Sequence, residues 1–142
     1  MALARVVATR DLRDLHVVEL GAGLGLPSLA AALRGADVLA TDWADDAVTL
    51  LRENAERNGV RLRVVRVRWD EPEELVAAAP WDIVLGADLL YEARNAEQLL
   101  SLLPRLGGEI LLADPGRPFA RSFLDRWQVE TLADGVYSLR LP

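Results

Sequence analysis

Short apolar runs alternate along this chain with segments whose apolar residues recur at helical spacing. The apolar runs predict strands at 16–20, 37–41, 62–67, 81–86 and 108–113. The helical spacing predicts helices at 27–34, 45–57 and 71–79, a fourth over Ala96, Leu99, Leu100 and Leu103, and a fifth marked by Phe119, Phe123 and Leu124. Strands that alternate with helices in this way commonly lie parallel in one sheet, so the pattern predicts an α/β fold.

The end of the chain departs from this alternation. Segments 127–132 and 136–141 both alternate apolar and polar residues, and Ala133, Asp134 and Gly135 between them are a hairpin signal. Two strands joined this tightly must be antiparallel. The sequence therefore predicts a Rossmann-like, doubly wound, mainly parallel sheet with a C-terminal antiparallel hairpin. Arginines at 61, 63, 66 and 68 place the third strand towards an edge of that sheet.

Length and composition narrow the class of protein. A chain of 142 residues is about one domain, and we expect residues 1–142 to form a single one. The net charge of −6 argues against nucleic acid as the main partner, and no apolar stretch approaches the ~18 residues that a membrane span needs. Without cysteine there is no disulfide framework and no thiolate metal site, so we expect a cytoplasmic protein, and its acidic balance is common in bacterial enzymes. All 16 basic residues are arginine, so the chain has no lysine side chain of its own to modify.

The segment 19–25 reads Glu-Leu-Gly-Ala-Gly-Leu-Gly and lies between the first predicted strand and the first predicted helix. Its three glycines allow a sharp turn and let a ligand come close, and the following helix offers free N–H groups at its start. A dinucleotide fingerprint has its third glycine three positions after the second, whereas Gly25 follows Gly23 by two and Leu26 stands in that place. Glu19 would fit a cationic ligand better than a pyrophosphate. A tight turn without a ligand remains the alternative for this segment taken alone.

Polar residues follow the second, fourth and fifth predicted strands, at the end of the sheet where ligands of such folds bind. Asp42 could accept both ribose hydroxyls of a nucleoside, or could cap the helix that starts near Asp45. Trp43 beside it could cover an adenine face or belong to the core. The fourth strand ends in Gly-Ala-Asp-Leu-Leu-Tyr at 86–91, and Asp-Pro-Gly-Arg-Pro follows the fifth at 114–118.

These segments resemble those of a known class of enzymes. The run Glu-x-Gly-x-Gly-x-Gly is similar to motif I of the class I, or seven-strand, S-adenosylmethionine-dependent methyltransferases, whose sheet also closes with such a hairpin. The Asp-x-x-Tyr pattern of Asp88 and Tyr91 resembles the signature of the seven-strand protein lysine methyltransferases. The run at 114–118 is similar to one in the electron transfer flavoprotein β-subunit lysine methyltransferases and their bacterial relatives. The likeness covers roughly residues 16 to 127.

The resemblance implies S-adenosylmethionine as methyl donor, no metal, and an acceptor lysine in the electron transfer flavoprotein β subunit or another lysine-bearing protein. It implies that Asp88 orients the acceptor amine and that Tyr91 offers its ring to the methylated product. Residues at the ends of the first four strands would hold the donor: Glu19, Gly21, Ala22, Gly23, Gly25, Asp42, Trp43, Trp69, Asp70 and Ala87. Asp70 would accept from the adenine amino group, unless it serves only to begin the next helix.

One departure from the family pattern concerns the start of the chain. Members usually carry several dozen residues before the first strand, including a tryptophan-containing segment that helps cover the donor, whereas 15 residues precede His16 here. Residues 1–5 look like the tail of that region's last helix, so we expect the N-terminal lid to be missing, through a shortened gene product or because a partner supplies it. Two other functions stay open: methyl transfer to a small molecule, and a binding-only relative without activity.

Overall fold

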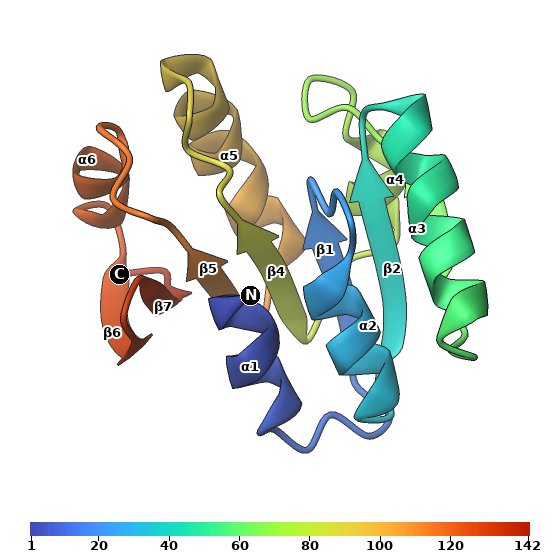
Figure 1. Ribbon diagram of the computed structural model, residues 1–142. Coiled ribbons are helices and arrows are strands. Elements are labelled where there is room, and N and C mark those ends of the chain that lie inside the picture. The colour runs from blue at the N-terminus through green and yellow to red at the C-terminus, as the bar shows by residue number, and fades with distance from the viewer.

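A seven-stranded sheet forms the middle of the structure, with its strands in the order β3-β2-β1-β4-β5-β7-β6 (Figure 1). The structure is a computed structural model that describes residues 1–142. The strands are β1 (His16–Leu20), β2 (Asp37–Asp42), β3 (Arg63–Arg66), β4 (Ile83–Ala87), β5 (Glu109–Ala113), β6 (Gln128–Ala133) and β7 (Val136–Arg140). The helices are α1 (Ala2–Ala8), α2 (Leu26–Leu33), α3 (Asp45–Arg57), α4 (Glu73–Ala77), α5 (Ala93–Leu106) and α6 (Ala120–Leu124).

The strand pairing confirms the predicted fold. β1 lies between β2 and β4, and these three strands are parallel to one another and to β3 and β5. β7 runs against its neighbours, because it pairs antiparallel with both β5 and β6. Gly135, with a φ of +66°, closes the short turn between β6 and β7, as the hairpin signal predicts. β3 lies at one edge of the sheet, as its arginines predict.

The order of the strands reverses at β1, since β2 and β3 lie on one side of it and the later strands on the other. At such a reversal the connections leave the sheet towards opposite faces, and a crevice opens beyond the carboxyl ends of the strands. The loops after β1, β2 and β4 are therefore the ones that the topology brings to a common ligand site.

The two faces of the sheet bury separate apolar cores, because successive side chains of a strand point to opposite faces. In β1, Val17 belongs to the core beneath α1 and α2, and Val18 belongs to the larger core beneath α4, α5 and α6. In Figure 1, α1 and α2 lie in front of the sheet and α5 lies behind it. Glu19, two residues after Val17, therefore points to the face that α2 covers.

Most elements begin and end within two residues of their predicted positions. α4 is shorter than the predicted helix at 71–79, because Pro72 is its N-cap and Glu71 forms a short antiparallel bridge with Arg68. β4 starts at Ile83 instead of at Trp81, whose backbone N–H bonds to the last carbonyl of α5 and not to a neighbouring strand. The residues before β1 form α1, which packs into the core beneath it.

Candidate active site

A cavity of about 650 Å³ opens beside the ends of β1, β2 and β4, where the order of the strands reverses. This volume is within the range of sites for small-molecule ligands. Eight of the twelve predicted site residues line it: Gly21, Asp42, Trp43, Trp69, Asp70, Ala87, Asp88 and Tyr91. The other four are not among its lining residues and belong to β1 and the loop after it: Glu19, Ala22, Gly23 and Gly25.

Three glycines shape the loop after β1, with φ angles of +56° at Gly21, +55° at Gly23 and +75° at Gly25. A Cβ atom at Gly21 would lie 2.8 Å from Leu89 Cδ2, and one at Gly25 would press on Leu51. Nothing lies within 4 Å of the Cβ position of Gly23, so this part of the loop faces open space. A ligand can therefore approach the backbone at Gly23 without a side chain in the way.

Asp42 connects the loop after β1 (residues 21–25, the glycine loop) to the loop after β2. Its Oδ2 accepts a hydrogen bond from the Gly23 N–H at 3.0 Å, and its Oδ1 accepts one from the Ala44 N–H at 3.0 Å. It does not cap α3, whose N-cap is Ala44. Asp42 is largely buried and still lines the cavity, so the free lone pairs of its carboxylate are available to hydroxyl donors there.

Glu19 anchors the start of α2. The residue is 1% exposed, and its Oε2 accepts hydrogen bonds from the Ser28 N–H, at 2.9 Å, and from the Ser28 hydroxyl. Burial raises the pKa of Glu19 to about 8, although the hydrogen bonds from Ser28 act in the opposite direction. The structure thus places this acid against α2 and outside the cavity lining, and its predicted contact with a cationic ligand stays a prediction.

The residues after β2 and β3 form one side of the cavity. Trp43 is 62% exposed, which excludes the core position that the sequence left open for it. Trp69 lies close to the glycine loop, with its Cζ2 3.5 Å from the Cβ position of Gly21. Asp70 accepts hydrogen bonds from Arg68 on both oxygens, at 3.0 and 2.6 Å, and these bonds lower its pKa. An adenine amino group would share the Asp70 carboxylate with Arg68.

Asp88 follows β4 directly and has a φ of +54°, a conformation that few residues other than glycine, asparagine and aspartate adopt. Its backbone N–H donates to the Ala113 carbonyl at 2.8 Å, which holds the loop against the end of β5. Arg117 donates from Nε to Asp88 Oδ1 and from Nη2 to Asp88 Oδ2, both at 2.8 Å. These bonds lower the pKa of Asp88, so the group is a carboxylate at neutral pH.

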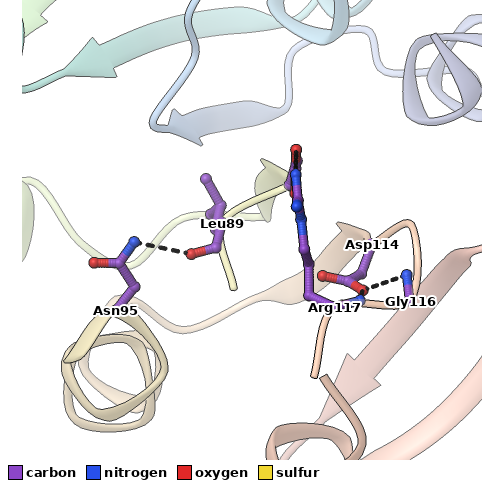
Figure 2. A network of polar contacts seen from close by, with 6 residues as sticks. Leu89, Asn95, Asp114, Gly116 and Arg117 are labelled. Carbon is purple, nitrogen blue, oxygen red and sulfur yellow. Dashed lines mark hydrogen bonds and ion pairs between the residues drawn. The ribbon is translucent and has the colours of Figure 1, made fainter. Parts of the chain in front are cut away.

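Tyr91 is half exposed and lines the same cavity as Asp88. The segment between them is fixed from α5, where the buried Asn95 donates from Nδ2 to the Leu89 carbonyl at 3.2 Å (Figure 2). Leu89 and Leu90 are themselves buried in the core. The outer residues of the Asp-x-x-Tyr pattern therefore remain accessible while its middle residues hold it in place.

Four residues that shape the site are absent from the predicted set: Ser28, Asn95, Asp114 and Arg117. Ser28 could be inferred from alternation in β1, which points Glu19 to the face of α2. Asn95 is a polar residue in the apolar stripe of α5, and that interruption is its signal. The pairing of Asp88 with Arg117 has no local signal, because it joins residues that are 29 positions apart.

Three ion pairs lie in or beside the cavity: Arg68 with Asp70, Arg94 with Glu92, and Arg117 with Asp88. No group of three or more histidine, cysteine, aspartate or glutamate residues is placed to hold a metal ion. None of the helices combines the length and the apolar character that crossing a membrane requires.

Known proteins are similar to this chain in sequence and in fold. A family model described as lysine methyltransferase matches residues 1–113. Protein N-lysine methyltransferase METTL21A of Danio rerio is 36% identical over 101 residues, which cover 68% of this chain and 46% of that protein. Histone-arginine methyltransferase METTL23 of Xenopus laevis is 37% identical over 97 residues, which cover 64% of this chain and 41% of that protein. The crystal structure of ribosomal protein L11 methylase from Lactobacillus delbrueckii subsp. bulgaricus is similar with a TM-score of 0.66 and 26% identity, over 96% of this chain and 74% of that one.

The chain spans less than half the length of the two curated relatives. The part that the family model matches contains the glycine loop, Asp42 and the Asp-x-x-Tyr segment. The likeness to the L11 methylase extends over nearly the whole chain. The chain therefore has the class I methyltransferase fold and belongs to the lysine methyltransferase family.

Proposed function

We propose that this chain transfers a methyl group from S-adenosylmethionine to the side-chain amine of a lysine in another protein. The observation that carries the proposal is the position of Asp88. Its carboxylate stands directly after β4, on a residue with left-handed φ, and lines the same cavity as Asp42 and Gly21. Family membership supports the reaction type, and the relative METTL21A is named as a protein N-lysine methyltransferase.

The residues around the cavity fit the donor. The open backbone at Gly23 admits a bulky ligand, and the Asp42 carboxylate beside it has free lone pairs for the two ribose hydroxyls. Trp43 and Trp69 offer apolar surface at the cavity wall for an adenine ring. When bound, S-adenosylmethionine supplies an electrophilic methyl group on a sulfonium centre.

On the acceptor side, Asp88 provides a negative charge and two hydrogen-bond acceptors for an amine. A lysine ammonium group has an ordinary pKa of about 10.4 and must release a proton to solvent before its nitrogen can attack the methyl group. The N–C bond then forms as the S–C bond breaks, and S-adenosylhomocysteine leaves. Asp88 would orient the amine by accepting a hydrogen bond from it, so that its lone pair faces the donor. The exposed ring of Tyr91 would stabilise the cationic methylated product.

An arginine acceptor is a second candidate that one observation favours. The two parallel bonds from Arg117 to Asp88 show that this carboxylate accommodates a guanidinium. The relative METTL23 is named as a histone-arginine methyltransferase, which is in keeping with that geometry. Lysine remains the first proposal because the matching family model is described as lysine methyltransferase.

Labelled methyl transfer tests both candidates. The chain is incubated with tritiated S-adenosylmethionine and a bacterial lysate, and the labelled proteins are hydrolysed to amino acids. Because the chain contains no lysine, any methyl-lysine recovered must come from another protein. Label in methyl-lysine supports the proposal, and label in methyl-arginine alone supports the second candidate. Label that stays in the small-molecule fraction contradicts both. The electron transfer flavoprotein β subunit is the first purified acceptor to assay, because the run at 114–118 resembles that of its methyltransferases.

A further inference from the structure

Asp114 lies beside Asp88 at the carboxyl end of the sheet. Ala87 and Ala113 are register partners in the parallel pair β4 and β5, and each is followed directly by one of the two aspartates. The Asp88 N–H bonds to the Ala113 carbonyl at 2.8 Å, which ties the two loops together. Asp114 is 4% exposed, so this second aspartate is buried, whereas the Asp88 side chain is accessible.

One carboxylate oxygen of Asp114 accepts hydrogen bonds and the other does not. Oδ1 accepts hydrogen bonds from the Gly116 N–H at 2.7 Å and from the Arg117 N–H at 2.8 Å. Oδ2 is buried and has no hydrogen-bond partner. Figure 2 shows Arg117 rising from this loop, with the Asp114 carboxylate beside the base of its side chain. A buried carboxylate oxygen is nearly always partnered in folded proteins, so an unpartnered one at a functional site indicates a position for a donor.

The charges of this cluster leave room for one more cation. Asp88 and Asp114 supply two carboxyl groups, whereas Arg117 supplies one guanidinium, which hydrogen-bonds to Asp88. The hydrogen bond from Arg117 to Asp114 is donated by its uncharged backbone N–H. Its Nε and Nη2 are both engaged by Asp88, so the guanidinium does not satisfy Asp114 Oδ2 in this arrangement. Hydrogen bonds to Asp88, together with the charge of Asp114, raise the pKa of Arg117 and keep it charged.

We propose that the Arg117 guanidinium occupies the place on Asp88 where the ammonium group of an acceptor binds. When that ammonium group binds Asp88, the guanidinium moves to Asp114 Oδ2. Asp114 and Arg117 are then positioning residues that select for charge, because a neutral side chain cannot replace a guanidinium on a carboxylate. The identification of the incoming cation as a lysine side chain rests on the proposed function, whereas the exchange itself rests on these three residues.

The exchange can be followed by NMR on the intact chain without an identified acceptor. The probe is n-butylammonium chloride, which has the charge and the alkyl chain of a lysine side chain, and 1-butanol is its uncharged counterpart. In protein labelled with nitrogen-15, the Nε–H signal of Arg117, assigned by its loss in Arg117→Gln, should shift saturably with n-butylammonium and not with 1-butanol. The titration is run with and without saturating S-adenosylhomocysteine.

Two variants should change the affinity for the probe in opposite directions. Arg117→Gln removes the competing cation, so n-butylammonium should bind about threefold tighter or more, read from the backbone amide of Asp88. Asp114→Asn keeps an oxygen for the two backbone N–H groups but offers Arg117 no second carboxylate, so binding should weaken about fivefold or more. Asp11→Asn breaks a similar aspartate–arginine pair with Arg13 on the surface and should leave the affinity unchanged.

The results separate this inference from the proposed function. If Arg117→Gln leaves the affinity unchanged or lowers it, or if the Arg117 signal does not respond to n-butylammonium, the exchange is wrong. If Asp114→Asn binds the probe as well as wild type does, Asp114 is not the second position. If Asp114→Asn fails to fold, the direction of the Arg117→Gln change decides alone. An Arg117 response in a protein that does not bind S-adenosylhomocysteine would uphold the exchange and refute the proposed function.

Discussion

The carboxylate of Asp42 accepts a hydrogen bond from the backbone N–H of Gly23 at 3.0 Å, and this contact joins the end of β2 to the middle of the glycine loop. Asp42 is the last residue of β2, and Gly23 lies in the loop after the neighbouring strand β1, 19 positions earlier. The contact orients the open backbone at Gly23 and the free lone pairs of Asp42 with respect to each other. Donor binding should therefore depend on both residues, in ways that substitutions can separate.

Replacement of Asp42 by asparagine should weaken S-adenosylhomocysteine binding about tenfold or more, because hydrogen bonds to a charged group contribute about 1.5–3 kcal/mol. Asparagine keeps an oxygen that can accept one of the two backbone N–H groups, so the loop should keep most of its shape. Isothermal titration calorimetry measures the change. An affinity equal to that of wild type would remove Asp42 from the donor site.

Replacement of Gly23 by alanine should abolish detectable donor binding at little cost in stability beyond backbone strain. The φ of +55° costs an alanine about 1 kcal/mol, and its Cβ would meet nothing in the protein itself. Gly59 is a matched control, with a φ of +63° and equally open space at the end of α3. Both alanine variants should lose similar free energy of unfolding in urea, and only Gly23→Ala should lose the ligand. Equal donor binding by the two would show that no ligand approaches Gly23.

Replacement of Asp88 by asparagine should lower methyl transfer about 100-fold or more, because a neutral amide orients the acceptor amine less firmly than the carboxylate does. Asparagine tolerates the left-handed φ of this position, so the loop should persist. The dissociation constant for S-adenosylhomocysteine should stay within about twofold of wild type, because the predicted role of Asp88 concerns the acceptor. Tritium transfer into the acceptor fraction and calorimetry give the two values. Turnover that survives the substitution would exclude Asp88 from the reaction.

Glu19 should make the free energy of unfolding depend on pH. Burial raises its pKa from 4.5 to about 8 in the folded chain. Between these values the folded state holds a proton that the unfolded state has released, so stability is greatest at the acid end and falls as the pH rises. The slope is at most about 1.4 kcal/mol per pH unit for one group.

Glu19→Gln isolates this dependence, because glutamine can still accept the two hydrogen bonds from Ser28 without titrating. Urea unfolding of wild type and variant is compared at several values between pH 4.5 and pH 8. As the pH rises, the free energy of unfolding of the variant should increase relative to that of wild type. The contributions of other titrating groups cancel in this difference. Parallel curves would mean that Glu19 is not buried as a protonated acid.

Sequence patterns predict the fold because all seven strands and most of the helices carry a local signal; α1 is the exception, since the pattern predicts no helix before β1. Alternating apolar runs mark the strands, and the turn at Asp134 and Gly135 marks the antiparallel hairpin. The predicted helix at 71–79 is longer than α4 because Pro72 is the N-cap of α4 and Glu71 bridges Arg68, three residues earlier in the same loop.

The sequence predicts the place of the candidate site in the fold for those residues that follow the ends of strands, and their function stays a prediction. Asp42 and Asp88 lie at the edge where parallel strands bring their carboxyl ends together, as expected. The partners of these residues could not be predicted, since Arg117 reaches Asp88 only through the pairing of β4 with β5. The direction of the Glu19 side chain can be predicted from the sequence, because alternation in β1 turns it towards α2 and away from the cavity lining.

Calorimetric titration of the wild-type chain with S-adenosylhomocysteine, with NAD as the parallel ligand, tests the central claim most directly. If the cavity beside Gly21, Asp42 and Asp88 is a methyl-donor site, S-adenosylhomocysteine will bind saturably with one molecule per chain and NAD will give no binding heat. A chain that binds NAD, or that gives no heat with S-adenosylhomocysteine at millimolar concentration, would contradict the account.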